Sequence, residues 1–266
     1  MSERVRPSVA ARARLRASRL RSALPMLRLA PLVLATLFVA CSGDAPTPSS
    51  PATNPDDADL PAASEAISAD VEASEPATTT YVLVLGNSLT AGYGLANPEA
   101  DAYPALLQTR IDDAGLDAQV VNAGVSGDTS AGGRRRIDWV LRRQPVDVLV
   151  RALGGNDGLR GLSPDSMQAN LSAIIASVRE LNAEADVVVA GMEAPPNMGD
   201  TYTSAFRQVF RDLAAEHDAA LVPFLLDGVG GIPAMNQPDG IHPTTGGQER
   251  LASNVWPVLR SVLQNG

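Results

Sequence analysis

An unbroken run of apolar, strand-forming residues from Tyr81 to Leu85 leads directly into Gly86, Asn87 and Ser88. Such a run, without alternating polar residues, is typical of a strand that is covered on both faces in the parallel sheet of an α/β domain. In these sheets ligands bind at the carboxyl ends of the strands. The glycine lets the chain turn sharply there, so that main-chain N–H groups become free to face a ligand. The run therefore predicts a buried strand that delivers Ser88 to a site.

The residues that follow alternate between apolar strands and helices with one apolar face. Further strands are predicted at 119–122, 146–153, 186–191 and 220–224, and helices at 102–114, 131–143, 164–181 and 201–217. Ser163 is expected to cap one of these helices, and Thr245 with Gln248 fits a capping box for a last helix. Alternation of this kind predicts a parallel sheet with helices on both faces.

Charge divides the 266-residue chain into three parts. Residues 1–41 carry eight arginines and one acidic residue, residues 42–79 carry eight acidic residues and no basic one, and the rest is again acidic. The apolar stretch 29–40 is shorter than the roughly 20 residues that span a bilayer, but it suits a signal peptide. We therefore expect an export signal at 1–41, a disordered linker rich in acids, proline, alanine and serine at 42–79, and the folded domain at 80–266.

The single cysteine, Cys41, follows the apolar stretch directly. The sequence from Leu37 to Cys41 resembles the processing site of bacterial lipoproteins, in which the cysteine is lipidated and becomes the amino terminus. Two alternatives stay open: an ordinary cleaved signal with an incidental cysteine, and a start at Met26 instead of Met1. We expect an exported protein with a lipid anchor at Cys41 and no internal disulfide, because a lone cysteine cannot form one.

Three of the predicted strands are followed by a reactive or hydrogen-bonding group flanked by glycine, and these groups belong to Ser88, Gly127 and Asn156. A fourth group lies near the carboxyl terminus. The fourth group is the pair Asp239 and His242, and three residues of chain span at most roughly 10 Å, so a turn can place the carboxylate against the imidazole. A serine hydroxyl is a weak nucleophile until a base takes its proton and a partner orients that base. We expect Ser88 to be the nucleophile, His242 the base and Asp239 its partner.

The oxyanion formed in acyl transfer needs preorganised hydrogen-bond donors. The main-chain N–H groups of Ser88 and Gly127 and the side-chain amide of Asn156 are placed in the sequence to supply them. The other histidine, His217, lies at the end of a predicted helix, where a structural role is expected.

Four segments resemble, in order and spacing, the motifs of the SGNH hydrolase family, which includes the GDSL esterases and lipases. They are 86–89 (Gly-Asn-Ser-Leu), 126–129 (Ser-Gly-Asp-Thr), 154–157 (Gly-Gly-Asn-Asp) and 239–243 (Asp-Gly-Ile-His-Pro). Longer strings around the first three are similar to the bacterial arylesterase, thioesterase I and lysophospholipase branch, and the resemblance covers about 81–263. It implies a flavodoxin-like three-layer α/β/α fold with a central five-stranded parallel sheet, no metal or other cofactor, and hydrolysis through an acyl-enzyme. Asn87 departs from the aspartate that the family usually has, and its amide is expected to hold the turn by hydrogen bonding.

The expected function is a serine esterase for small to medium acyl esters, with thioesters and lysophospholipids as further substrates. Two alternatives stay open: a carbohydrate O-acetyl esterase or acyltransferase with the same chemistry, and a non-catalytic envelope binding protein, which Asn87 suggests. Phosphate-binding motifs of the G-x-G-x-x-G and G-x4-G-K-[ST] types do not occur. The acidic, lysine-free domain argues against a nucleic-acid partner, so Arg134 to Arg136 are expected on a solvated helix face. Asp128 and Asp157 are expected to structure loops.

Overall fold

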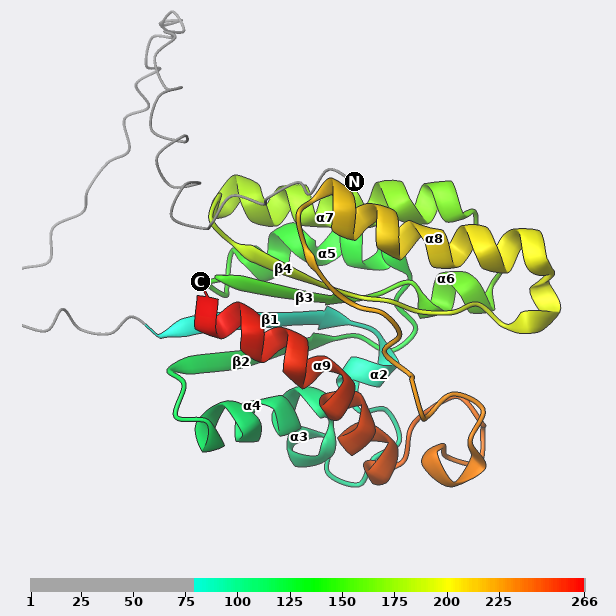
Figure 1. Ribbon diagram of the computed structural model, residues 1–266, viewed down its shortest axis with the longest axis horizontal. Coiled ribbons are helices and arrows are strands. Elements are labelled where there is room, and N and C mark those ends of the chain that lie inside the picture. The colour runs from blue at the N-terminus through cyan, green and yellow to red at the C-terminus, as the bar shows by residue number, and fades with distance from the viewer. Residues whose placement is uncertain (1–78, 266) are drawn as a thin grey trace, which may run out of the picture. The chain divides into compact units, whose positions relative to one another are not determined.

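The strands form one parallel sheet of flavodoxin-like order. The computed structural model describes residues 79–265, so the predicted export signal and Cys41 lie outside the described residues. The sheet order is β2-β1-β3-β4-β5 (Figure 1), with every neighbouring pair parallel. The strands are β1 (Thr80–Gly86), β2 (Ala118–Gly124), β3 (Val148–Ala152), β4 (Asp186–Ala190) and β5 (Ala220–Val222). The predicted five-stranded parallel sheet is confirmed.

Helices cover both faces of this sheet and make the three layers (Figure 1). One face carries α2 (Ser88–Ala91), α3 (Pro98–Asp101), α4 (Tyr103–Asp113) and α9 (Thr245–Asn265), and the other carries α5 (Ser130–Leu141), α7 (Pro164–Leu181) and α8 (Asp200–Glu216). The short elements α6 (Gly155–Leu159), η1 (Pro196–Met198) and η2 (Pro233–Met235) lie in loops. None of the helices between residues 79 and 265 is long and apolar enough to cross a membrane.

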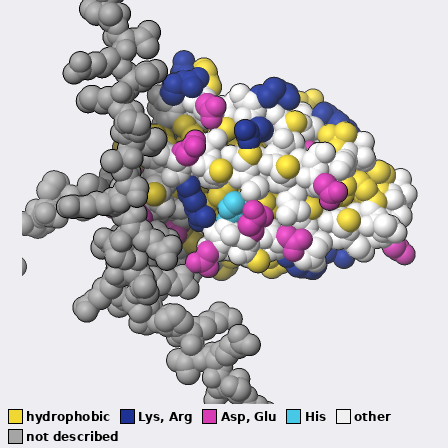
Figure 2. Space-filling view, turned by 90° about the horizontal axis from the view of Figure 1, so that it is seen from above, with side chains coloured by type: hydrophobic (Ala, Val, Ile, Leu, Met, Phe, Trp, Pro, Cys, Tyr) yellow, Lys and Arg dark blue, Asp and Glu magenta, His cyan; other side chains and the backbone are white. Residues whose placement is uncertain are grey.

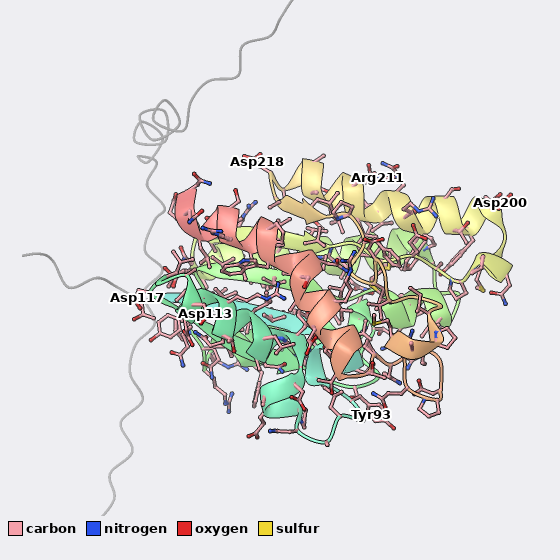
Figure 3. All side chains as sticks on the ribbon, turned by 60° about the horizontal axis from the view of Figure 1, so that its bottom comes forward. Tyr93, Asp113, Asp117, Asp200, Arg211 and Asp218 are labelled. Atoms are coloured by element: carbon pink, nitrogen blue, oxygen red, sulfur yellow. The ribbon has the colours of Figure 1, made fainter. Side chains whose placement is uncertain are left out.

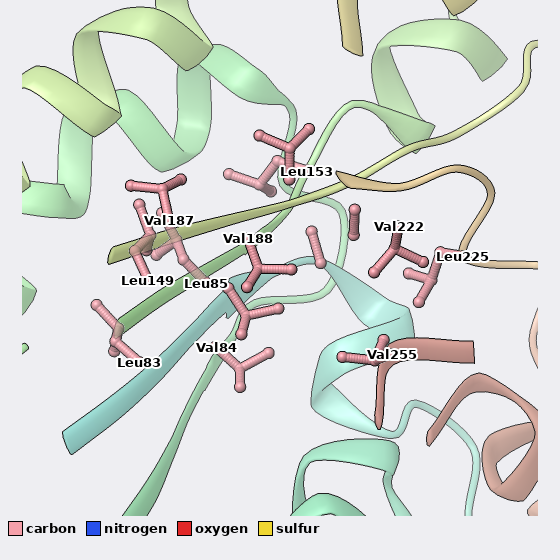
Figure 4. Close-up of a cluster of buried hydrophobic side chains, with 14 of the residues drawn as sticks. Leu83, Val84, Leu85, Leu149, Leu153, Val187, Val188, Val222, Leu225 and Val255 are labelled. Atoms are coloured by element: carbon pink, nitrogen blue, oxygen red, sulfur yellow. The ribbon is translucent and has the colours of Figure 1, made fainter. Parts of the chain in front are cut away.

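The core lies on both sides of the three inner strands, which explains why their sequences do not alternate. Leu83 and Leu85 of β1, Leu149 of β3 and Val188 of β4 have no exposed surface. Figure 4 shows the core on both sides of the strands, with Leu149 and Val187 on one side and Val84 on the other, where Val255 of α9 lies. Each large apolar side chain that is fully buried contributes roughly 1.5–3 kcal/mol to folding, so the two-sided burial stabilises the sheet that carries the site.

The carboxyl ends of three neighbouring strands stop at the same level of the sheet. Gly86, the last residue of β1, pairs in register with Gly124, the last residue of β2, and with Ala152, the last residue of β3. The loops that follow these strands therefore start at one edge, as Ser88, Gly127 and Asn156 require if they are to meet.

Side-chain caps at two helix starts test the local predictions. Ser163 accepts a hydrogen bond from the Ser166 N–H at 3.4 Å, which confirms the predicted cap of α7. The capping box predicted for the last helix is wrong. The cap of α9 is Thr244, whose Oγ1 accepts the Gly247 N–H at 3.3 Å, one residue before the predicted position.

Gln248 points into the core instead of back to the start of α9. Its side chain is 1% exposed, its Oε1 accepts the Tyr103 N–H at 2.9 Å, and its Nε2 donates to the Leu89 carbonyl at 3.2 Å. A buried amide is stable only with such partners, and these are supplied by α4 and α2. Gln248 thus joins three helices on one face of the sheet.

Candidate active site

Ser88 is the first residue of α2, directly after the turn that ends β1. The turn is held by Asn87, whose Oδ1 accepts the Leu89 N–H at 3.0 Å. The amide therefore takes the turn-holding role expected of it. At the first helical position the main-chain N–H of Ser88 has no acceptor within the helix. Ser88 thus presents both a hydroxyl and a free N–H at the edge of the sheet.

Close packing holds α2 against the sheet and against α4. The Thr90 Oγ1 lies 2.9 Å from the Tyr103 hydroxyl, and both side chains are fully buried. Burial raises the pKa of Tyr103, so its hydroxyl stays protonated. On the other side of α2, a Cβ on Gly124 would lie 2.3 Å from the Ala91 nitrogen. Only glycine lets β2 end so close to the helix that carries the serine.

A chain of hydrogen bonds joins Ser88, His242 and Asp239. His242 Nε2 lies 3.0 Å from Ser88 Oγ, and His242 Nδ1 lies 2.6 Å from Asp239 Oδ2. The bond from the His242 ring and the main-chain N–H groups of His242 and Ile241 lower the pKa of Asp239 to about 2. An ionised carboxylate only accepts hydrogen bonds, so Nδ1 carries the proton and Nε2 is left to accept the serine hydroxyl.

Donors for a negative oxygen line the same cavity. Asn156 Nδ2 donates one hydrogen bond to the Asp128 carbonyl at 2.8 Å. An amide nitrogen has two N–H groups, so one remains for a ligand. Gly127 also lines the cavity, with a φ of 82° that favours glycine. Between residues 79 and 265, the main-chain N–H groups of Ser88 and Gly127 donate to no protein acceptor.

The cavity beside Ser88 has a volume of about 730 Å³ and is lined by both polar and apolar residues. Ser88, His242 and Asn156 are among the polar ones. In Figure 2, hydrophobic side chains gather towards the right-hand end, which is the end at which the strands finish in Figure 1. The larger apolar lining residues are Leu159, Met192, Phe224, Leu226 and Ile241.

Arg136 corrects the expectation that Arg134 to Arg136 share a solvated face. Its neighbours in that run are exposed, but Arg136 is partly buried. Its Nε donates to Asp128 Oδ2 at 2.6 Å, and its Nη2 donates to the carbonyls of Gly86 at 3.0 Å and Ala123 at 2.8 Å. One guanidinium thereby ties the ends of β1 and β2 to the loop of Asp128, and the loop-structuring role expected of Asp128 is confirmed.

Asp157 also structures a loop, as expected. It is 2% exposed and accepts hydrogen bonds from the Ser130 hydroxyl at 2.6 Å and the Ser130 N–H at 2.8 Å. The loop of Asn156 is thereby fastened to the start of α5. Behind it, burial lowers the pKa of Arg151 to about 9, and Asp157 partly offsets that shift.

The second histidine forms a contact at the other end of the molecule. His217 follows α8, and its Nε2 lies 2.8 Å from the Ser172 hydroxyl on α7. Glu216 approaches the same ring nitrogen at 3.8 Å, so it cannot orient the ring from the opposite nitrogen as a triad acid does. None of the three lines the cavity, and in Figure 3 the neighbouring Asp218 lies far from Tyr93. The structural role expected of His217 fits this geometry.

Metal ligands do not gather in the described part of the chain. Among residues 79–265, no group of three or more histidine, cysteine, aspartate or glutamate side chains could hold a metal ion. The arrangement that these residues do offer is a hydrogen-bonded serine and histidine beside free N–H donors, which is suited to acyl transfer.

Three residues support the site in a way that was not predicted from the sequence: Arg136, Gln237 and Gln248. Each is a long polar side chain whose partners are main-chain groups of distant segments. A main-chain partner leaves no mark in the sequence, so no motif identifies such residues. The position of Gln237, two residues before Asp239, is the one hint that the sequence offers.

Comparisons with known proteins agree with this geometry. The model of the GDSL-like Lipase/Acylhydrolase family matches residues 84–250. Esterase TesA of Pseudomonas aeruginosa is 44% identical over 189 residues, which are 71% of this chain and 92% of the relative. The thioesterase 1/protease 1/lysophospholipase L1 of Escherichia coli K12 is 40% identical over 177 residues, 66% of this chain and 81% of the relative.

A solved structure shows the same likeness. The psychrotrophic esterase EstA from Pseudoalteromonas sp., in a crystal structure described as inhibited by monoethylphosphonate, is 31% identical with a TM-score of 0.64. The match covers 70% of this chain and 100% of the EstA chain. With the family model, the relatives and the sheet order in agreement, the chain belongs to the GDSL-like lipase and acylhydrolase family, the SGNH hydrolases.

Proposed function

We propose that this protein is a serine esterase that hydrolyses small to medium acyl esters through an acyl-enzyme on Ser88. The observation that carries the proposal is the chain of hydrogen bonds from Ser88 Oγ through both nitrogens of His242 to Asp239, beside N–H donors without an acceptor. The esterase and thioesterase names of its relatives agree with it.

In the first step, Ser88 Oγ attacks the ester carbonyl while His242 Nε2 takes the hydroxyl proton. The imidazolium that forms is stabilised by Asp239, which stays ionised. The negative oxygen of the tetrahedral intermediate is held by the N–H groups of Ser88 and Gly127 and by the second N–H of Asn156. Removing one such donor typically lowers kcat by about 10²–10³.

The first tetrahedral intermediate then collapses to the acyl-enzyme. His242 gives its proton to the leaving alcohol, and the carbonyl carbon stays bonded to Ser88 Oγ. In the second half-reaction, a water molecule attacks the carbonyl carbon of the acyl-enzyme while His242 Nε2 accepts a proton from the water. The same N–H donors hold the negative oxygen of the second tetrahedral intermediate. The proton finally returns to Ser88 Oγ as the carboxylic acid leaves. One imidazole therefore serves both half-reactions, which requires that it stay fixed between them.

The apolar walls of the cavity support an acyl chain as the group bound beside Ser88. A volume of about 730 Å³ exceeds what a small acyl group fills, so medium chains are included in the proposal. Thioesters and lysophospholipids belong to the proposed substrate range because the E. coli relative carries both activities in its name. The walls offer few polar groups to recognise a sugar, and no feature of the site favours the glycan esterase.

We further propose that the esterase is exported and anchored by a lipid at Cys41. The support is the sequence alone: a short apolar stretch, a cysteine directly after it, and an acidic linker before the domain. A Cys41→Ser variant is expected to leave the membrane fraction when cells are fractionated. Retention of that variant in the membrane fraction would contradict the anchor.

The test of the proposed activity is hydrolysis of p-nitrophenyl esters of increasing acyl length by purified protein. Ser88→Ala is expected to lower kcat by roughly 10⁴–10⁶, because within residues 79–265 Ser88 supplies the hydroxyl that is hydrogen-bonded to His242 Nε2. Ser172→Ala is the matched control, since it removes the serine bound to the other histidine and should leave kcat unchanged. Equal rates for wild type and Ser88→Ala would refute the proposal.

A further inference from the structure

The ring of Tyr93 lies against the ring of His242. The ring centroids are 4.6 Å apart, and the planes are tilted by 44°. The tyrosine is 53% exposed, whereas the side chain of His242 is only 16% exposed. Figure 3 labels Tyr93 at the edge of the molecule, close to the segment that leads into α9. An exposed aromatic ring thus packs at a tilt against the imidazole.

Gln237 fastens the segment of Tyr93 to the segment of His242. Its Nε2 donates to the Tyr93 carbonyl at 2.7 Å and to the Pro243 carbonyl at 3.0 Å, and its main-chain N–H donates to the His242 carbonyl at 2.7 Å. Gly94 makes this contact possible, because a Cβ there would lie 2.1 Å from Gln237 Oε1. One residue therefore bonds to the main-chain segments of both rings.

The imidazole needs support beyond its partner carboxylate. Asp239 holds one edge of the ring through Nδ1. The bond of Nε2 to Ser88 Oγ is broken in each turnover, and the bond to Asp239 alone then leaves the ring free to tilt about it. His242 lies in a loop, and Nε2 has to face Ser88 and the leaving group in turn. A ring packed against the imidazole limits this movement, and its π-electrons attract the imidazolium that forms during the reaction.

We propose that Tyr93 is a positioning residue for His242 and that Gln237 holds it in place. This inference rests on the proposed esterase function. Tyr93 also lines the cavity, so contact with substrate is the competing role. Positioning slows every substrate alike through kcat, whereas a wall contact changes KM and depends on the size of the acyl group.

The first experiment compares kcat and KM for Tyr93→Phe and Tyr93→Leu on p-nitrophenyl esters from acetyl to octanoyl. Tyr93→Phe keeps the ring and should stay close to wild type. Tyr93→Leu should lower kcat by roughly 5- to 50-fold at every acyl length with little change in KM, because the imidazole is misplaced. Ile241→Ala is the matched wall variant, since Ile241 is 48% exposed and lines the same cavity. Its KM should rise more for longer chains.

A second measurement combines Tyr93→Leu with His242→Ala. A residue that acts through the imidazole has no further effect once the imidazole is absent, so the double variant should match His242→Ala in its residual rate. Gln237→Leu should reproduce part of the kcat loss of Tyr93→Leu. Thermal unfolding of each variant shows whether it has kept its fold.

The outcomes separate this inference from the proposed function. If wild type and Ser88→Ala hydrolyse the esters equally, the esterase function itself fails. If wild type is active and depends on Ser88, two results would overturn the positioning role of Tyr93. One is a Tyr93→Leu variant that keeps the wild-type kcat, whether or not its KM changes. The other is a Tyr93→Leu substitution that lowers the activity of His242→Ala by as much as it lowers that of wild type.

Discussion

Asp239 shows how an exposed carboxylate can still be held firmly. Its Oδ1 accepts two main-chain N–H groups, from Ile241 and His242, while Oδ2 accepts the imidazole proton. These bonds favour the charged form, which lowers its pKa from the ordinary 3.8 to about 2. The carboxylate is therefore ionised at neutral pH.

This shift predicts a pH-dependent contribution of Asp239 to stability. A carboxyl group with a lowered folded-state pKa stabilises the fold fully above its unfolded value of 3.8 and loses that contribution as the pH falls towards about 2. The free energy of unfolding of wild type should therefore exceed that of Asp239→Asn by a constant amount above pH 4. The excess should shrink between pH 4 and pH 2. Urea unfolding across this range checks it, and an excess that does not change with pH would contradict it.

Single residues also show where prediction from sequence stops. The meeting of Ser88, His242 and Asp239 could be predicted because a serine, a histidine and an aspartate are the residue types that a hydrolase of this kind requires, and the chain offers only two histidines. Arg136 and Gln237 could not, because their partners are carbonyl groups of segments that only the fold brings close.

Among the elements, β2 and α2 pack at a distance that only glycine allows. The Cβ of an alanine at Gly124 would lie 2.3 Å from the Ala91 nitrogen and 2.7 Å from the Thr90 carbonyl carbon. Main-chain atoms cannot rotate away as a flexible side chain can. The helix that carries Ser88 would have to shift away from the sheet.

Gly124→Ala is therefore expected to cost about 1–3 kcal/mol of stability by overpacking and to lower kcat by moving Ser88 away from His242. Urea unfolding and p-nitrophenyl acetate hydrolysis measure the two effects. Gly246→Ala is the control, since the nearest atom to its added Cβ would be Thr244 Oγ1 at 4.0 Å, and it should lower neither. A Gly124→Ala protein with wild-type stability and kcat would show that α2 is not held as tightly as described.

The elements themselves were predictable because the apolar periodicity of strands and helices reflects burial directly. The start of the last helix was not. Thr244 and Thr245 are equivalent in a sequence pattern, and the buried partners of Gln248 decide which of them caps α9. A local pattern fails where a distant contact competes with it.

In the whole molecule, the sheet aligns the ends of β1, β2 and β3, and the carboxyl-terminal segment closes over them with His242. Ser88 and His242 are 154 residues apart and meet at 3.0 Å. The parallel sheet could be inferred from the alternation of elements, but this meeting depends on how the loop before α9 folds back. The function thus depends on the tertiary fold rather than on any one segment.

Covalent labelling by a p-nitrophenyl phosphonate ester, located by mass spectrometry of the digested protein, tests this convergence most directly. The phosphorus should bond to Ser88 Oγ alone with release of p-nitrophenol, and His242→Ala should slow labelling at least about 10²-fold because the base is lost. Labelling at another residue, or an unchanged rate in His242→Ala, would contradict the assignment of Ser88 and His242 as nucleophile and base.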